Sequence, residues 1–369
     1  MAAAAGQLVE RNNKRDAQEA ELAEGEGEAA GGVVTPLEHL HAHGFTDRDL
    51  KCLKEAGYTT VEAVAYASSR LLQQVKGISE QKVAKLKEAV KGLVHMGFSS
   101  ATEINLMRQQ IVKLTTGCAG FDAILGGGIE TGMLTEVFGE FRSGKTQVCH
   151  TLAVTSQLPV EQGGAEGRVA WIDSEGTFRP ERITKIAERF GLDAEQVLEN
   201  IAHARAYNVE HQTELLVQAA SMMVEARFAL LIVDSVTALY RSEYQGRGQL
   251  ADRQGHLCQF LRKLQRMADE FGIAVVYTNQ VVATVDPMAV FRGGEDKKPI
   301  GGHIMAHASQ TRLYLKKGKG QNRVAKIYDS PSMPDNIDAK FAITENGVSD
   351  EIKDKDNKRQ KKNGDGDDE

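Results

Sequence analysis

Hydrophobic residues follow two alternating patterns between residues 115 and 345. Short runs rich in Val, Ile and Leu, each bounded by polar or turn residues, predict strands buried on both faces at 134–138, 169–173, 229–234 and 273–278. Between and around these runs, longer stretches predict helices at 147–156, 180–190, 211–226 and 250–271. Alternation of strands and helices predicts an α/β fold, in which a mostly parallel sheet has helices on both faces. Two later runs, 311–316 and 323–328, flank Gly318-Lys319-Gly320 and predict an added hairpin.

Residues 35–96 have a different pattern, in which short helices are separated by glycine turns. Helices are predicted at 47–55, 61–67 and 79–95, the last with apolar residues at helical spacing. The stretch from Leu71 to Ser79 predicts a helix, a tight turn at Gly77 and a second helix capped by Ser79. Helix-hairpin-helix modules use such a turn to aim backbone amides at a nucleic-acid phosphate. A small all-α bundle that only supports a partner domain fits this pattern equally well.

The two ends of the chain are polar and charged. Residues 1–34 lack aromatics and any apolar period, which predicts a disordered acidic tail, and residues 350–369 predict a second, charged one. These ends carry the whole net charge of -6, so residues 36–349 sum to zero. A uniformly basic nucleic-acid binder is thereby excluded, and any such surface must be local. The patch Lys358-Arg359-Gln360-Lys361-Lys362 has two interpretations, a nuclear-import signal or a solvated tail.

Membrane and extracellular classes do not fit the composition. The longest apolar run found, 228–233, is too short to cross a bilayer, and charged residues interrupt the Ala-rich start of the chain. Four cysteines are widely scattered, without paired metal-ligand spacing or a disulfide pattern. We expect a reducing, intracellular setting and no membrane partner.

A phosphate-binding P-loop follows the first predicted strand of the sheet and precedes a helix. Its residues are Gly139, Glu140, Phe141, Arg142, Ser143, Gly144, Lys145 and Thr146. The glycines let backbone amides surround the phosphates of a nucleotide, Lys145 supplies a positive charge, and the Thr146 hydroxyl is a magnesium ligand. This motif, in this context, predicts nucleotide binding.

Three polar residues at the ends of other predicted strands support that prediction. Asp234 ends the 229–234 run, where a carboxylate can hold magnesium through water. Glu175, just after the 169–173 strand, is a candidate to orient or deprotonate the attacking water, although it could simply cap a loop. Gln280 follows the 273–278 strand and could sense the outer phosphate, but polar residues are common at strand ends.

Two loops and a linker add candidate binding surfaces. Residues 241–253 and 281–302 combine glycines, positive charge and apolar or aromatic residues, as a groove for a single strand requires. Either loop alone could be an ordinary surface loop, but 22 residues without structure are usually functional. Residues 97–114 predict a linker that leads into a helix at 102–113, with Phe98 as an exposed aromatic among small residues.

Three motifs then resemble the RecA/RadA family of DNA strand-exchange recombinases. They are the P-loop, the run 172–180 (Ile-Asp-Ser-Glu-Gly-Thr-Phe-Arg-Pro) and the run 230–235 (Leu-Leu-Ile-Val-Asp-Ser). Further matches extend the resemblance over residues 36–349, nearest to the general, mitotic-type recombinases of eukaryotes. The resemblance implies a RecA-like ATPase core at 115–349, a helix-hairpin-helix DNA-binding domain at 35–96, and a polymerisation motif in the linker at 97–114.

The resemblance also implies the activity. Such proteins bind ATP and Mg²⁺, polymerise as helical filaments on single-stranded DNA, and exchange strands with a homologous duplex during double-strand break repair. It implies a slow, DNA-dependent ATPase in the nucleus, assisted by recombination mediators.

Site residues are implied by position. Glu175, Lys145 and Gln280 would be catalytic, with Thr146 and Asp234 at the metal and Asp329 to Pro334 capping a neighbour's ATP. DNA would be contacted by Arg142, Arg241, Arg247, Val285, Lys316 and Lys326. The interface between subunits would use Phe98, Ala101, Ala202, Ala204 and His307, with Phe98 inserted near the two alanines of the next subunit.

Some features depart from the family pattern or leave alternatives open. Lys316 stands where arginine is frequent, and the second loop contains Pro287 and an unusual stretch at 292–296. The run 173–176 favours the general recombinase over its meiosis-specific sister. A non-catalytic assembly factor and a ring helicase share the ATPase core, but the polymerisation motif and DNA loops favour a filament former.

Overall fold

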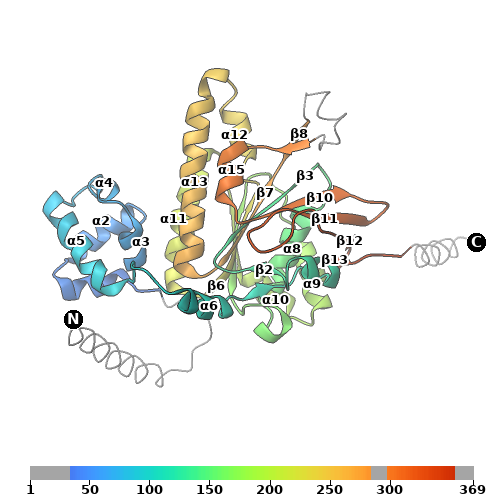
Figure 1. Cartoon of the computed structure of the whole chain (residues 1–369), viewed down its shortest axis with the longest axis horizontal. Coiled ribbons are helices and arrows are strands. Elements are labelled where there is room, and N and C mark those ends of the chain that lie inside the picture. The colour runs from blue at the N-terminus through green and yellow to red at the C-terminus, as the bar shows by residue number, and fades with distance from the viewer. Residues whose placement is uncertain (1–33, 284–296, 354–369) are drawn as a thin grey trace, which may run out of the picture. The chain divides into compact units, whose positions relative to one another are not determined.

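The computed structural model describes residues 34–283 and 297–353 (Figure 1). The predicted disordered tails therefore lie outside the described residues, apart from Val34 and residues 350–353, and so does Val285 in the second loop.

Short helices with hydroxyl caps make up the N-terminal region. They are η1 Leu37–His43, α2 Asp47–Glu55, α3 Val61–Tyr66, α4 Ser69–Leu72 and α5 Glu80–Leu93. Side chains of Thr46, Thr60, Ser68 and Ser79 accept backbone N–H groups at the starts of α2 to α5, which satisfies donors that the helix leaves unpaired. The helices enclose their own apolar cluster, which includes the fully buried Leu53. The helices predicted at 47–55, 61–67 and 79–95 are confirmed to within two residues.

A nine-stranded sheet forms the centre of the remaining fold, in the order β13-β12-β11-β10-β3-β7-β6-β4-β5. Parallel pairing joins β3 Leu134–Gly139, β4 Arg168–Asp173, β5 Ile201–Arg205, β6 Phe228–Asp234, β7 Ala274–Asn279 and β10 Thr311–Lys317. Antiparallel pairing adds β11 Asn322–Asp329, β12 Asp338–Thr344 and β13 Gly347–Asp350 beside β10. The predicted mostly parallel sheet and the 311–328 hairpin are confirmed.

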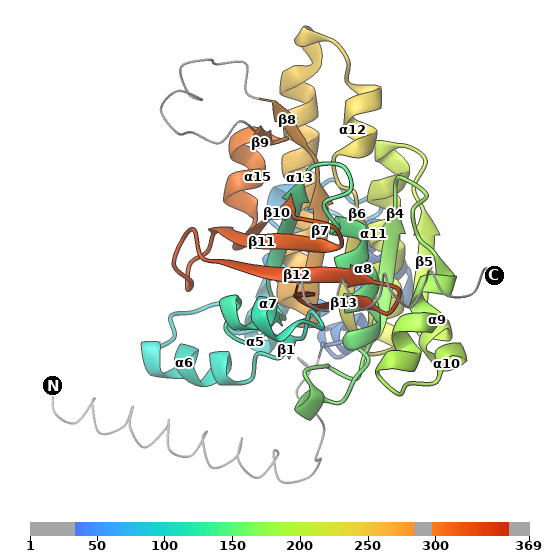
Figure 2. The same ribbon diagram turned by 90° about the vertical axis from the view of Figure 1, so that its right-hand side faces the viewer.

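Helices cover both faces of this sheet (Figures 1 and 2). One face packs against α7 Ala119–Ile124, α8 Lys145–Thr155, α9 Pro180–Arg189 and α10 Ala194–Glu199. The other packs against α11 Val209–Glu225, α12 Ala238–Glu243, α13 Leu250–Phe271 and α15 Gly302–Ala308. Successive residues of β6 enter the two layers in turn, Leu230 and Ile232 on one side, Leu231 and Val233 on the other. Burial on both faces explains why the strands are continuous apolar runs.

Smaller elements complete the described chain. They are α6 Ala101–Gln109, η2 Val160–Gln162, η3 Arg247–Gln249, and two two-stranded sheets, β1 Lys113–Leu114 with β2 Ile129–Glu130 and β8 Val281–Ala283 with β9 Lys297–Pro299.

Two boundaries differ from the sequence-based expectation. The helix predicted at 102–113 spans Ala101–Gln109: a capping box between Ser100 and Glu103 starts it one residue earlier, and it ends before Lys113, which pairs in a strand instead. The core predicted at 115–349 continues past residue 349, since Asp350 ends β13 and the Ile352 N–H donates to Asn322 Oδ1 at 3.1 Å.

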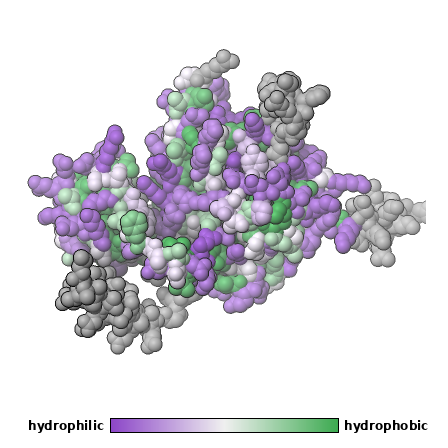
Figure 3. Space-filling view, viewed as in Figure 1, coloured by the Kyte–Doolittle hydropathy of each residue, from purple (hydrophilic) through white to green (hydrophobic). Residues whose placement is uncertain are grey.

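Within the described ranges, no helix has the length and apolarity needed to cross a membrane. Hydrophilic residues dominate the face seen in Figure 3, with hydrophobic residues in separate small patches. All four cysteines have free thiols.

Candidate functional site

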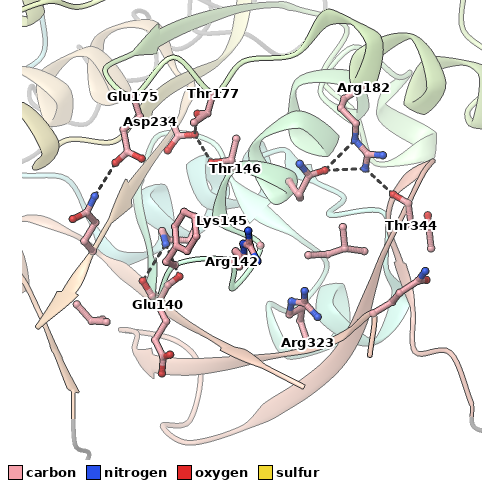
Figure 4. A pocket seen from close by; sticks show the side chains of 18 of the residues that line it. Glu140, Arg142, Lys145, Thr146, Glu175, Thr177, Arg182, Asp234, Arg323 and Thr344 are labelled. Atoms are coloured by element: carbon pink, nitrogen blue, oxygen red, sulfur yellow. Dashed lines mark hydrogen bonds between the residues drawn. The ribbon is translucent and has the colours of Figure 1, made fainter. Parts of the chain in front are cut away.

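A pocket of about 960 Å³ opens where β3, β4, β6 and β7 end (Figure 4). We divide its lining into two walls. The loop-motif wall consists of the P-loop with Glu175, Thr177 and Asp234, and the strand wall consists of Gln321, Arg323, Ile343, Thr344 and Glu345. Arg182, Arg241 and Gln280 also reach the pocket. Ends of neighbouring parallel strands thus bring together groups that are far apart in sequence.

Two glycines let the P-loop turn between β3 and α8. A Cβ atom at Gly139 would overlap the carbonyl oxygen of Leu315 on β10. Gly144 has φ of 106° at the N-cap of α8, and a Cβ there would lie 2.6 Å from Ile343 Cδ1. A side chain at either position would push the turn out of shape. Because both residues are glycines, the backbone amides and the start of α8 can face the pocket.

Lys145 and Thr146 begin α8 inside the pocket. The Lys145 ammonium donates to the carbonyls of Gly139 at 3.0 Å and Glu140 at 2.9 Å. Burial lowers the pKa of Lys145, while the nearby Asp234 and Glu175 carboxylates oppose that shift. A cation held in a partly desolvated pocket suits the binding of phosphate groups.

Asp234 ends β6 and is almost fully buried, with 2 % of its surface exposed. Its carboxylate accepts hydrogen bonds from the hydroxyls of Thr146 at 2.7 Å, Thr177 at 3.4 Å, and Thr278. Burial raises the pKa of Asp234, and the bonds from Thr278 and Thr146 counteract this rise.

The side-chain oxygen atoms of Thr146 and Asp234 suit a magnesium ion. A hydroxyl backed by a carboxylate supplies hard oxygen ligands, and Mg²⁺ typically takes one or two protein groups together with phosphate oxygens and water. Within residues 34–283 and 297–353, no cluster of three or more His, Cys, Asp or Glu side chains offers an all-protein metal site. The Thr146 hydroxyl and the Asp234 carboxylate are the hard oxygen groups that the pocket would offer to such an ion.

Glu175 lies on a loop that Asp173 organises. The Asp173 carboxylate accepts the backbone N–H groups of Glu175 at 2.9 Å, Gly176 at 2.6 Å and Phe178 at 3.2 Å. Oε1 of Glu175 in turn accepts hydrogen bonds from Ser235 Oγ at 3.0 Å and from the side-chain amide of Gln280 at 2.8 Å. The structure thus brings Glu175, Gln280 and Lys145 into one pocket, while their catalytic roles stay predictions.

An aromatic cluster supports the same loop from behind. His150 of α8 accepts the Arg179 N–H at Nε2, at 3.0 Å, so its Nδ1 carries the proton and donates to the Thr146 carbonyl at 2.7 Å. Burial lowers the pKa of His150 to about 4, which keeps the ring neutral near pH 7. Ring centroids of Trp171 and Phe178 lie 5.0 Å apart, and that of Trp171 lies 4.9 Å from His150. These contacts hold the loop of Glu175 against α8.

Sequence reasoning missed the strand wall and the residue that attaches it. Arg182 of α9 donates to Gln147 Oε1 at 2.8 Å and to the carbonyls of Thr344 at 2.6 Å and Glu345 at 2.7 Å (Figure 4). Thr177 and Arg182 stand within or just after the 172–180 motif, which was a usable signal. The β12–β13 turn carries no such sequence signal, because its backbone shape, and not a motif, brings it to the pocket.

The residues predicted to contact DNA are distributed over several elements. Arg241 of α12 donates to the side-chain oxygen of Gln280 at 2.5 Å, and Arg247 begins η3. Lys326 lies opposite Tyr314 on the neighbouring strand, and Lys316 Nζ lies 4.7 Å from the centre of the Tyr314 ring. The two lysines therefore share one face of the hairpin.

Arg142 is a further residue that the sequence predicts to contact DNA. It lines the 960 Å³ pocket and has a left-handed backbone with φ of 63°. Its guanidinium carbon lies 5.4 Å from the centre of the Phe141 ring.

Four of the residues predicted at the interface between subunits lie in two separate segments. Phe98 is fully exposed just before α6, which begins at Ala101. Ala202 and Ala204 lie half-buried on β5, which is an edge strand of the sheet.

Other predicted residues lie outside the pocket of their own chain. His307 lines a separate cavity beside His303. Asp329 ends β11 and Pro334 follows it, and neither belongs to the pocket lining.

Comparisons with known proteins show which family the chain belongs to. The Rad51 family model matches residues 107–351. A maize protein named DNA repair protein RAD51 homolog B is 58% identical over 315 residues, which covers 85% of this chain and 92% of the relative. DNA repair protein RAD51 homolog 1 of Arabidopsis thaliana is 57% identical over the same shares. DNA repair protein rhp51 of Schizosaccharomyces pombe is 56% identical, covering 85% of this chain and 86% of its own.

The predicted resemblance to strand-exchange recombinases is therefore confirmed over most of the chain, and with it the use of a nucleotide, the binding of DNA and self-association. The chain belongs to the Rad51 family and is a DNA-dependent ATPase that exchanges DNA strands in the repair of DNA by homologous recombination.

Proposed function

We propose that ATP binds in the 960 Å³ pocket, with Mg²⁺ held by Thr146 and Asp234, and that the bound nucleotide makes successive subunits grip single-stranded DNA. The observation that carries this proposal is a chain of side-chain hydrogen bonds that leaves the pocket. Glu175 accepts from Gln280, and Gln280 accepts from Arg241 at the first predicted DNA loop. A change at the outer phosphate therefore has a physical route to a DNA-contacting residue.

Hydrolysis in this pocket depends mainly on positioning and on charge. Lys145 places its ammonium at the outer phosphates, and the P-loop amides surround them. When bound, the magnesium ion would neutralise charge on the phosphate oxygens. Glu175, held by Ser235 and Gln280, orients the attacking water and accepts its proton.

Gln280 shares its amide group between the reaction and the DNA loops. Its amide nitrogen donates to Glu175, and its amide oxygen accepts from Arg241. When Glu175 turns to the attacking water, Gln280 loses that acceptor, and the bond to Arg241 changes with it. DNA bound at the loops would act on Glu175 through the same two bonds, which explains a DNA-dependent ATPase.

Self-assembly would use Phe98 and the free edge of β5. An exposed aromatic at one place and an edge strand with small residues at another would form a head-to-tail interface, which gives an open helical filament when the rotation per subunit does not close a ring. The next subunit would bring Asp329 to Pro334 over the nucleotide and His307 near it. A site shared in this way links ATP to filament growth.

The finer DNA contacts and the cellular setting belong to the same proposal. Arg247 and Val285 would contact the first strand, while Arg142, Lys316 and Lys326 would hold the incoming duplex. Because the substrate is chromosomal DNA, we place the protein in the nucleus, where mediators would load it.

Electron microscopy and strand exchange together test this function. With single-stranded DNA and a non-hydrolysable ATP analogue, wild-type protein should form helical filaments, and with ATP it should exchange strands only with a homologous duplex. Phe98→Glu should stay monomeric with an unchanged thermal midpoint, because the Phe98 side chain is fully exposed within the part of the chain that the structure describes.

Val160→Glu, which adds the same charge at another exposed apolar residue, is the matched control and should polymerise normally. Normal filaments from Phe98→Glu would refute the assembly proposal. Exchange with heterologous duplexes, or unwinding without exchange, would refute the recombinase mechanism.

A further inference from the structure

Asn279 uses every hydrogen bond that its side chain can make. It ends β7 and is fully buried. Its amide nitrogen donates to Glu136 Oε1 at 2.7 Å and to the Ile300 carbonyl at 2.7 Å, and its amide oxygen accepts from Thr237 Oγ1 at 2.8 Å and from the Gln280 N–H at 2.8 Å. An asparagine amide offers two donors and two acceptor sites, so this group is saturated.

The four hydrogen-bond partners of Asn279 lie at or near the ends of the two predicted DNA loops and in the strand that precedes the P-loop. Thr237 precedes α12, where the first predicted DNA loop begins. Gln280 and Ile300 stand at the two ends of the second predicted DNA loop, and the Ile300 N–H also donates to the Gln280 carbonyl at 3.0 Å. Glu136 lies in β3, three residues before the P-loop. One buried amide therefore joins both loops to the phosphate-binding strand.

Glu136, the partner of Asn279 on β3, is held by an ion pair. Glu136 is fully buried and pairs with Arg312 of β10, whose Nε lies 2.6 Å from Glu136 Oε2. Burial raises the pKa of Glu136, while Arg312 and Asn279 oppose that rise. The Arg312 guanidinium also lies 5.1 Å from the centre of the Tyr328 ring, one residue before Asp329. A carboxylate held on both sides is a rigid point of attachment for Asn279.

Gln280 and Asn279 differ in their surroundings although they are neighbours. The Gln280 side chain reaches the open pocket and is bonded to two groups, Glu175 and Arg241, which can change partners. Asn279 has no solvent contact and no spare hydrogen bond. A movement of the Gln280 side chain can shift the predicted DNA loops in a defined direction only if the backbone at Asn279 and Gln280 stays fixed.

We propose that Asn279 is a positioning residue that fixes the roots of both DNA loops to the P-loop strand, so that the state of the nucleotide is transmitted to DNA. The inference rests on the proposed function of the pocket and loops. It assigns Asn279 no contact with ATP or DNA. The quantity it governs is the gain in affinity for single-stranded DNA that ATP produces.

Three variants of the full-length chain test this role. Thr237→Val removes one of the four bonds and keeps the side-chain shape, Thr237→Ser retains the hydroxyl and is its matched control, and Asn279→Asp removes both donors. For each variant we would measure the thermal midpoint, the affinity for a fluorescent ATP analogue, and the dissociation constant for single-stranded DNA with and without ATP.

We expect the ATP-dependent gain in DNA affinity to fall about threefold in Thr237→Val and at least about tenfold in Asn279→Asp, as expected for lost buried hydrogen bonds. Thr237→Ser should keep the gain, and Thr237→Val should bind the ATP analogue within about twofold of wild type.

The possible outcomes are distinguishable. Folded variants that keep the full gain would overturn the inference. So would a loss of gain that only follows a loss of ATP affinity, because this would indicate a damaged pocket rather than lost transmission. If Asn279→Asp does not fold, Thr237→Val against Thr237→Ser decides alone. A wild-type protein without any ATP-dependent gain would instead refute the proposed function itself.

Discussion

The loop-motif wall and the strand wall of the pocket present their polar groups in different ways. In the loop-motif wall, Glu175 and Asp234 stand at or just after the ends of parallel strands and accept hydrogen bonds from neighbouring elements, as Asp234 does from Thr146 of α8. The strand wall belongs to antiparallel strands, and its turn is tied to α9 through main-chain carbonyls that accept from Arg182. Chemistry in the first wall depends on residue type, whereas the second depends on backbone shape and on one arginine.

The largest expected effect concerns the loop-motif wall. Lys145→Ala removes the only ammonium among the residues that line the pocket, and ATP binding should weaken by about 100-fold or more, as expected when a charge-assisted contact to phosphate is lost. Equilibrium binding of a labelled ATP analogue measures this. Lys85→Ala, at an exposed lysine of α5, should bind normally. Equal ATP affinity in both variants would show that the P-loop is not part of the nucleotide site.

A smaller effect should separate the contribution of the strand wall. Arg182→Gln loses the fork of hydrogen bonds to Thr344 and Glu345, so the β12–β13 turn should loosen and ATP affinity should fall about tenfold. Titration calorimetry with a non-hydrolysable analogue gives the affinity. Arg182→Lys keeps the charge but not the fork, and should recover only part of it. Full recovery by lysine would show that charge, not backbone shape, is what this wall supplies.

The smallest effect concerns the support behind the loop-motif wall and appears as a pH dependence. The folded protein keeps His150 neutral with a pKa of about 4, whereas its ordinary value is 6.5. The unfolded chain therefore binds more protons between these values, and stability is present above pH 6.5 and lost as the pH falls toward 4. His150 should account for a loss of about 1 kcal/mol between pH 6.5 and 5.5.

Urea unfolding at the two pH values measures this loss. His150→Gln has no titrating ring and should lose less stability over the same interval than wild type. His211→Gln serves as the control, because that ring lies beside Tyr207 at the start of α11, away from the pocket. A wild-type loss equal to that of His150→Gln would contradict the assignment of a buried neutral ring.

The two walls also differ in how far the sequence predicts them. The P-loop, Glu175 and Asp234 stand directly after apolar runs, and parallel strands bring such positions to one edge, so their meeting could be expected. Arg323 and Thr344 follow no motif, and their approach to the pocket depends on how a hairpin and a further antiparallel pair extend the sheet. Pairing order of this kind is a property of the whole fold.

Strand β5 illustrates the same limit for the fold. Its residues, Ile201–Arg205, alternate two half-buried alanines with polar side chains, so no apolar run predicts a strand there. Parallel pairing with β4 provides the hydrogen bonds that its weak pattern does not. Asn279 shows a third case, since the residue type suggests only a polar strand end and burial alone reveals that its amide is saturated.

The chain contains a single tryptophan, Trp171, and it lies in the aromatic cluster beneath the loop of Glu175. The indole ring is fully buried between His150 and Phe178. Its emission therefore arises from one known place, so unlabelled protein carries an intrinsic optical probe of the loop that contains Glu175. Displacement of that loop during turnover would change the brightness and colour of one ring, without a dye or a foreign residue.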